Sequence, residues 1–341
     1  MKFEISNLFL AVLLSGMCIL CPGAMVGLPG SSAYAAEKDL PSWKDGATRT
    51  RIVRFVKAVS DKRSKDYVAP ADRVAVFDND GTLWCEKPIY PQFIFALDRV
   101  QSVVDERPEL GNEPLFKSAL SKDFDALAKS GAHGIQRLIG VTHGGMTSDK
   151  FDEIVANWMV SSKHPRFKRP FNKCVYKPML ELLEYLRKNQ FSTYIVSGGG
   201  RDFMRPWAGA TYGIGREQVV GSSCKLEYKD GDVFRTETIA VLNDGKEKPV
   251  GIQCQIGKRP IAAFGNSDGD LEMLMWTDAK DKKRKGPSLC ALVRHTDMDR
   301  EYSYDKDSKV GRLDKALKEA RERNWLVVDM KEDWLKIFPF E

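Results

Sequence analysis

Three short apolar segments, each followed at once by a polar or glycine-rich loop, constrain the fold of this chain more than any other feature. They are residues 74–77, 191–196 and 261–264. Apolar runs of this length, bounded by turn-forming residues, are typical of strands that are buried on both faces of a sheet. Helical patterns lie between them, as at residues 179–188. The alternation predicts an α/β fold with a parallel, doubly wound sheet of the Rossmann type.

One long stretch interrupts this alternation. Residues 91–175 follow a mostly helical pattern, and we interpret them as an α-helical cap domain inserted into the core. The core domain then consists of residues 36–90 and 176–341. Within it, the pair Asp230-Gly231 lies between residues 224–229 and 233–242, and it favours the tight turn of a β-hairpin.

The first 35 residues have the pattern of an export signal. Lys2 and Glu4 are their only charged residues, and an apolar run covers residues 8–28. Small side chains at Ala33 and Ala35 suit a signal peptidase, so we expect cleavage after Ala35 and a periplasmic or secreted protein. A retained membrane anchor is the alternative, but no basic block follows the run. After cleavage we expect no stable membrane span.

Charge and composition exclude several classes of function. The chain of 341 residues has a formal net charge of +6, and 43% of its residues are hydrophobic. This composition excludes intrinsic disorder of the whole chain. Because the charges are mixed along the sequence, we expect a small anionic partner and no nucleic acid. The cysteines that follow the leader have no close spacing, so we expect no zinc site and predict no particular disulfide.

Two carboxylates follow the first predicted strand. Asp78 and Asp80 lie two residues apart at its carboxyl end, where open α/β sheets bind ligands. A carboxylate can attack phosphorus, and a second one can protonate the leaving oxygen and later activate water. Two close carboxylates repel each other, which favours a divalent cation, and oxygen ligands favour Mg²⁺. The alternative is a solvated acidic turn.

Two later strands end in loops of similar character. Ser197 and three glycines follow the second strand, where a hydroxyl and backbone N–H groups can hold phosphoryl oxygens. Residues 265–270, with one amide and two carboxylates, follow the third. Between them Lys248 precedes Pro249, so we expect it at a helix start with its ammonium group available for phosphate. Lys246 is the alternative residue for this role.

In this order the motifs resemble those of a known family. Residues 78–82, Ser197, Lys248 and residues 265–270 resemble the four ordered motifs of the haloacid dehalogenase superfamily of phosphatases. The helical insert is similar to the cap of the phosphoserine-phosphatase-like branch. Longer stretches are similar to secreted, uncharacterised hydrolases of that branch.

The resemblance implies a role for each matching residue. It implies that Asp78 is the nucleophile, that Asp80 is the general acid/base and that Lys248 neutralises charge on Asp78 and the phosphate. The residues that it implies for phosphoryl binding are Thr82, Ser197, Gly198 and Lys248. Those that it implies for Mg²⁺ are Asp78, Asp80, Asn266 and Asp270, with Asp268 as a further candidate.

The sequence departs from the family pattern in two places. Asn266 stands where a ligand aspartate is common, which reduces the charge of the metal site. Lys87 stands where phosphoserine phosphatases have a glutamate that meets the substrate amine, and Glu86 comes one residue early. We therefore do not expect phosphoserine itself as substrate. Asp80 favours phosphoryl transfer over carbon–halogen cleavage.

Other polar residues are weaker candidates. His143 lies in a cap segment that could reach over the site, with a turn between helices as the alternative. His295 and Arg300 follow the strand-like run at 289–294 and could line the site, with capping and ion pairing as the alternative. The basic residues at 280–285 could steer anions, although a solvated loop is the simpler interpretation.

These observations predict an exported, Mg²⁺-dependent phosphomonoester hydrolase that acts on a small phosphate ester through an aspartyl-phosphate. The alternatives are a phosphotransferase with an alcohol acceptor and a binding protein that has lost catalysis. No particular oligomeric state is predicted.

Overall fold

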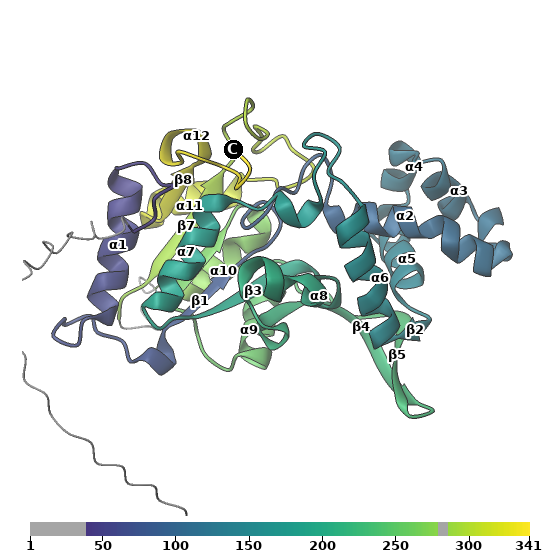
Figure 1. Ribbon diagram of the computed structural model, residues 1–341, viewed down its shortest axis with the longest axis horizontal. Helices are drawn as coiled ribbons and strands as arrows, with labels where there is room; N and C mark the ends of the chain where they lie inside the picture. The colour runs from purple at the N-terminus through teal and green to yellow at the C-terminus, as the bar shows by residue number, and fades with distance from the viewer. Residues whose placement is uncertain (1–38, 279–285) are drawn as a thin grey trace, which may run out of the picture. The chain divides into compact units, whose positions relative to one another are not determined.

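The computed structural model describes residues 39–278 and 286–341 (Figure 1). The predicted signal peptide with its cleavage site after Ala35, the alternative membrane anchor, and the basic segment at 280–285 lie outside the described residues. The described residues belong to one structural unit. In the described part of the chain, no helix combines the length and the apolar character needed to cross a membrane.

In the described residues, eight strands form one sheet in the order β2-β5-β4-β3-β1-β6-β7-β8. The central strand β1 (Val74–Phe77) pairs in parallel with β3 (Ser192–Gly200) and β6 (Ala262–Gly265). The parallel part continues through β7 (Leu289–Arg294) to β8 (Leu326–Asp329) on one side and to β4 (Val219–Lys229) on the other. The predicted parallel α/β sheet is confirmed.

Helices cover both faces of the sheet. Side chains of β1 alternate between two apolar clusters, with Ala75 and Phe77 in one and Val74 and Val76 in the other. The first cluster includes residues of α1 (Ala47–Ser60), α7 (Lys177–Lys188) and α8 (Arg201–Tyr212). The second includes residues of α9 (Glu247–Gln255), α10 (Leu271–Thr277) and α11 (Lys315–Arg323). The sheet is therefore doubly wound, as predicted, and the short α12 (Met330–Asp333) follows its last strand.

A helical segment lies between β1 and β3 in the sequence, as predicted. Its helices are α2 (Pro91–Glu106), α3 (Pro114–Leu120), α4 (Phe124–Lys129), α5 (Gly131–His143) and α6 (Ser148–Ser161). The first four share a separate apolar cluster that includes Leu97, Phe116 and Leu138. Phe95 and Trp158 join the main cluster on the sheet instead. The boundaries of the cap at 91 and 175 stay a prediction.

The hairpin of β4 and β5 (Asp232–Val241) packs against this helical segment. At its turn Asp230 and Gly231 both have positive φ, 54° and 87°, as the predicted tight turn requires. The middle of β5 contacts α5 so closely that a Cβ on Gly140 would collide with the carbonyl of Glu237. The short strand β2 (Met146–Thr147) also pairs with β5. The sequence did not predict that the hairpin would join the inserted segment (Figure 1).

The second motif differs from its prediction. We expected a strand that ends at residue 196 and a glycine loop after it, but β3 continues through Gly200. Its pairing with β4 changes register between Val196 and Gly200. The extension arises because β4 offers hydrogen-bonding partners beyond Val196, and only tertiary structure supplies this partner.

Candidate active site

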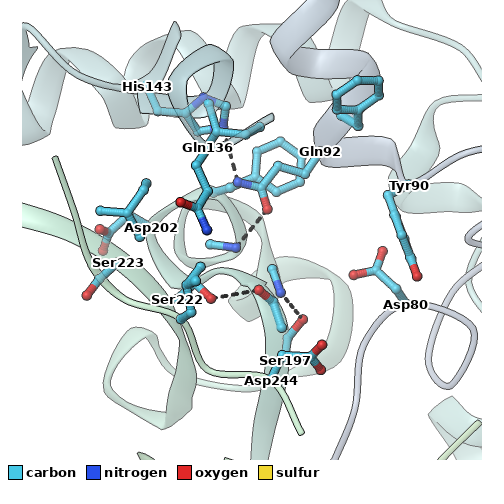
Figure 2. A pocket seen from close by; sticks show the side chains of 18 of the residues that line it. Asp80, Tyr90, Gln92, Gln136, His143, Ser197, Asp202, Ser222, Ser223 and Asp244 are labelled. Atoms are coloured by element: carbon cyan, nitrogen blue, oxygen red, sulfur yellow. Dashed lines mark hydrogen bonds between the residues drawn. The ribbon is translucent and has the colours of Figure 1, made fainter. Parts of the chain in front are cut away.

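The carboxyl ends of β1, β3 and β6 bring the predicted motifs to one edge of the sheet. A cavity of about 340 Å³ opens there, and Asp78, Asp80, Ser197 and Lys248 are among the residues that line it. Figure 2 shows Ser197 on one side of this cavity and His143, from the helical segment, on the opposite side. The structure thus brings together residues that are far apart in the sequence.

Lys248 lies between two carboxylates. Its Nζ donates to Asp78 Oδ1 at 2.7 Å and to Asp270 Oδ1 at 2.6 Å, and all three side chains are buried. Burial lowers the pKa of Lys248, but the charges of Asp270 and Asp78 outweigh burial and raise it overall. Lys248 is therefore a fixed cation at the base of the cavity. Lys246, its competitor, is exposed.

Asp78 is held in an environment that disfavours its charge. Burial, followed by the nearby charge of Asp270, raises the pKa of Asp78 well above its usual range, and Lys248 opposes this shift. Its backbone N–H donates to the carbonyl of Phe264 on β6 at 2.9 Å, which fixes the residue at the end of β1. An added cation near Asp78 would favour the ionised form.

Asp80 has the properties of a proton donor. Its Oδ1 accepts a hydrogen bond from Trp84 Nε1 at 2.9 Å. Burial raises the pKa of Asp80 to about 6, although the bond from Trp84 opposes the shift. A carboxyl group with a pKa near neutrality can both give and take a proton, which is what general acid/base catalysis requires.

Asn266 is held by residues of the first motif. Its Nδ2 donates to Glu86 Oε1 at 2.8 Å, and its Oδ1 accepts from the hydroxyl of Thr82 at 3.2 Å. Burial raises the pKa of Glu86 to about 7. Gly81, with a φ of 74°, lies so close to this pair that a Cβ there would collide with both side chains. Thr82 is fully buried and contacts Asn266, so it lies behind the cavity surface rather than on it.

The segment that carries Ser197 is held from several sides. The Ser197 hydroxyl accepts the N–H of Gly199 at 3.0 Å, and its carbonyl accepts Asn243 Nδ2 at 3.0 Å. Ser222 donates to the carbonyl of Gly198 at 2.7 Å. The side chain of Ser197 and the backbone of Gly198 therefore line the cavity in a fixed arrangement.

The carboxylates of Asp270 and Asp268 bind different partners. Asp270 Oδ2 accepts the backbone N–H groups of Asn266 and Ser267 at 2.9 and 3.0 Å, in addition to its bond from Lys248. Asp268 Oδ1 instead accepts the N–H groups of Asp314 and Ala316 at the start of α11. Asp268 thus acts as a helix cap in this structure.

Two further candidates lie away from the cavity surface. His295 is buried and donates through Nε2 to the carbonyl of Gly81 at 2.8 Å, while Nδ1 meets Glu301 Oε2 at 3.1 Å. It supports the turn of the first motif from behind. Arg300 forms an ion pair with Asp297 at 2.7 Å and donates to backbone carbonyls of the C-terminal segment, such as that of Leu335. This matches the ion-pairing alternative that we stated for it.

His143 is the last residue of α5 rather than part of a loop, and it lines the cavity. Burial, followed by the charges of Arg235 and Arg99, lowers its pKa to about 3. Gln92 Nε2 contacts His143 Nε2 at 3.1 Å, and Gln92 Oε1 accepts the N–H of Gly200 at 2.7 Å (Figure 2). The sequence analysis missed Gln92, and its place in the first turn of a helix soon after the first motif is the only local signal for it.

The described residues contain no group of three or more His, Cys, Asp or Glu side chains arranged to hold a metal ion. The site does contain oxygen donors of the kind that Mg²⁺ prefers, on Asp78, Asp80 and Asn266. Among the cysteines of the described residues, Cys85, Cys174, Cys224 and Cys254 are free thiols, and the first three are buried. Cys85 donates to Glu301 Oε1 at 3.0 Å in the interior of the protein.

Solved structures of other proteins are similar to this chain at low sequence identity. No curated protein sequence matches the chain. A conserved protein of unknown function from Anaerococcus prevotii shares 15% identity and a TM-score of 0.50, over 82% of this chain and 90% of that one. A protein of unknown function from Bordetella pertussis also shares 15% identity, with a TM-score of 0.48, over 76% of this chain and 98% of that one. A phosphoserine phosphohydrolase-like protein from Francisella tularensis shares 14% identity and a TM-score of 0.37, over 65% of this chain and 87% of that one.

The likeness to the Anaerococcus prevotii protein shows the fold alone. The sequence itself matches the model of the haloacid dehalogenase-like hydrolases over residues 75–275, which is more than half of the chain. The matched region begins in β1 and ends in α10, so it contains all four predicted motifs. The chain belongs to the haloacid dehalogenase-like hydrolase family.

Proposed function

We propose that the protein is a Mg²⁺-dependent phosphomonoester hydrolase that acts through an aspartyl-phosphate. The observation that carries this proposal is the position of Asp78. Its carboxylate meets the ammonium group of Lys248 at 2.7 Å and lines the same cavity as Asp80 and Ser197. A nucleophile, a cation, a proton donor and a hydroxyl beside one cavity are the groups that phosphoryl transfer needs.

The reaction would proceed in two steps. In the first, a carboxylate oxygen of Asp78 attacks phosphorus, the bond from phosphorus to the ester oxygen breaks, and Asp80 gives its proton to the departing alkoxide. In the second, Asp80 takes a proton from water, whose oxygen attacks the phosphorus. This releases inorganic phosphate and restores the Asp78 carboxylate. A pKa of Asp80 of about 6 suits both proton transfers.

Other residues would hold the phosphoryl group during both steps. Ser197 and Gly198 lie on the cavity surface and offer a hydroxyl and a backbone N–H. Lys248 offsets the charge of Asp78 and of the phosphoryl oxygens. Asp270 keeps Lys248 in place by accepting its second hydrogen bond at 2.6 Å.

The residues present suit a divalent cation. Asp78, Asp80 and Asn266 would hold it with oxygen atoms. Burial, followed by the charge of Asp270, raises the pKa of Asp78, and a bound cation would oppose this shift. When bound, Mg²⁺ would supply charge that favours ionised Asp78 and polarises a phosphoryl oxygen. Glu86 would orient the Asn266 amide through the 2.8 Å hydrogen bond.

Phosphate release tests this function. Purified protein is incubated with phenyl phosphate, with Mg²⁺ or with a chelator, and inorganic phosphate is measured. We expect release that depends on Mg²⁺ and on Asp78, with Asp78→Asn inactive but folded. Full activity of Asp78→Asn would overturn the mechanism, and no release from any phosphate ester would overturn the function.

We propose in addition that the protein is exported. The support is the apolar leader with Ala33 and Ala35 before its end. Expression of the full chain, followed by cell fractionation and N-terminal sequencing, tests this. A mature chain that begins at Ala36 outside the cytoplasm is expected, and an intact Met1 terminus in the cytoplasm would contradict export.

A further inference from the structure

We propose that the cavity selects esters of an uncharged, ring-sized alcohol and rejects esters whose alcohol carries a carboxylate or a second phosphate. This inference rests on the phosphatase function proposed above. It concerns the part of the cavity that lies beyond the phosphoryl site, toward α5 and β5.

The cations of the cavity are already paired. Among the described residues that line it, Lys248 and Arg235 are the basic ones, apart from His143. Lys248 belongs to the phosphoryl end. Arg235 is buried, and its Nη1 donates to Asp202 Oδ2 at 2.7 Å while its Nε donates to the carbonyl of His143 at 2.8 Å. Its guanidinium also lies over the ring of Phe151 at 4.1 Å.

His143 supplies no positive charge either. Gln92 Oε1 accepts the N–H of Gly200, so its Nε2 must be the atom that faces His143 Nε2. That ring nitrogen therefore accepts a hydrogen bond, while Nδ1 lies 2.9 Å from the hydroxyl of Thr142. This arrangement fits neutral imidazole, and burial acts in the same direction by lowering the pKa of His143.

A carboxylate or a second phosphate in this region would thus find no free cation. Burial of an unpaired charge is costly, because the charge loses its hydration without gaining a partner. The lining acids at the phosphoryl end, such as Asp244 beside Gly198, would repel an anion further. The charge pattern therefore selects against anionic alcohols.

The remaining walls favour an apolar group of moderate size. Apolar side chains of α2, α5, α8 and β5, and of the residue that follows β5, line this part of the cavity: Phe93, Ile135, Ile139, Phe203, Ile239 and Leu242. A cavity of about 150 Å³ accepts benzene. The present cavity, of about 340 Å³, has room for a ring in addition to a phosphoryl group.

Gln136 is a polar side chain that is available to recognise the alcohol. Gln136 lines the cavity, and its amide makes no hydrogen bond with the described residues. Figure 2 shows this amide pointing toward the cavity between His143 and Ser222. An amide can donate and accept but carries no charge, so it suits a neutral polar substituent on the ring.

Two esters of the same shape test the inference. The carboxylate of 4-carboxyphenyl phosphate replaces the neutral amide of 4-carbamoylphenyl phosphate, and kcat/KM is measured for both with wild-type protein and Mg²⁺. Because burying the unpaired carboxylate is costly, we expect the amide ester to be preferred by at least about tenfold. Equal values, or preference for the carboxylate ester, would overturn the inference.

Substitution of Asp202 sharpens the test. Asp202→Asn removes the carboxylate that pairs with Arg235, so the preference for the amide ester should shrink at least about threefold. Asp152→Asn is the matched control, because Asp152 pairs with Arg216 and does not line the cavity. An unchanged preference in a folded Asp202→Asn protein would count against the role of the paired charges. The wild-type comparison remains decisive if that variant does not fold.

Failure of the inference differs from failure of the function. If phenyl phosphate is hydrolysed and the two matched esters react equally, the phosphatase function stands and the selectivity is wrong. If none of the three esters releases phosphate, the function itself is overturned, and the inference with it.

Discussion

Asn266 Nδ2 donates a hydrogen bond to Glu86 Oε1 at 2.8 Å, in the interior of the site. The bond fixes which end of the amide is the oxygen, and that oxygen meets the hydroxyl of Thr82. Asn266 stands where family members often have an aspartate. Its neutral amide lies beside the carboxyl group of Glu86.

Glu86→Ala should weaken Mg²⁺ binding. Loss of the acceptor frees the Asn266 amide to turn, and residues that orient a metal ligand typically contribute about tenfold or more to affinity. Calorimetric titration with Mg²⁺ measures the affinity directly. Glu153→Ala, an exposed substitution on α6, is the control. The same affinity in both variants would show that Glu86 does not position the ligand.

Lys248→Met should abolish phosphate release and lower the free energy of unfolding. It leaves Asp78 and Asp270 buried without their cation, and loss of one partner of a buried ion pair costs about 3–5 kcal/mol. Urea unfolding and phosphate release measure the two effects. Lys246→Met, two residues away and exposed, should change neither. An active Lys248→Met protein of wild-type stability would contradict the proposed role.

Gln92→Ala should loosen the contact between the helical segment and β3. The substitution leaves the Gly200 N–H without its acceptor, and an unpaired donor costs about 1–3 kcal/mol. The free energy of unfolding should fall by that amount, and KM should rise because Gln92 lines the cavity. Gln101→Ala, on the exposed side of α2, serves as control. If both variants lower the free energy of unfolding equally, the hydrogen bond from Gly200 to Gln92 does not contribute to stability as predicted.

The ion pair of His295 and Glu301 should make stability depend on pH. Burial lowers the pKa of His295, but Glu301 outweighs it and raises the pKa overall. Burial likewise raises the pKa of Glu301, and His295 outweighs it and lowers the pKa. The stabilisation from His295 is complete below its unfolded pKa of 6.5 and is lost as pH rises through the higher folded pKa. That from Glu301 is complete above 4.5 and is lost as pH falls through the lower folded pKa.

His295→Gln should therefore destabilise most between these two values. A charged hydrogen bond contributes about 1.5–3 kcal/mol, so we expect a loss of about 2 kcal/mol at mildly acid pH and a smaller loss in alkali. Urea unfolding of wild type and variant across this range measures the difference. A loss that stays constant with pH would mean that His295 is neutral in the folded protein.

The parts of the fold that depend on local sequence were predictable. Val74 to Phe77 form a strand buried on both faces, as their apolar run indicated, and Asp230-Gly231 forms the expected turn. Lys248 lies in the first turn of α9, where Pro249 placed it. In each case the residues that decide the structure are neighbours in the chain.

The remaining features depend on distant partners. Gln92 contacts Gly200 across 108 residues, and Glu86 contacts Asn266 across 180, so no local pattern could reveal either pair. Asp268 and Asp270 look alike in the sequence, yet one caps α11 and the other holds Lys248. Their roles follow from which element packs beside each carboxylate.

The aspartyl-phosphate is the central claim, and its direct detection is the sharpest test. Wild-type protein with Mg²⁺ and phenyl phosphate is quenched in acid during turnover, and its peptides are analysed by mass spectrometry. We predict one added phosphoryl group on Asp78, and none anywhere in Asp78→Asn. Phosphate release with no phosphoryl group on Asp78, or with the group on another residue, would contradict the account.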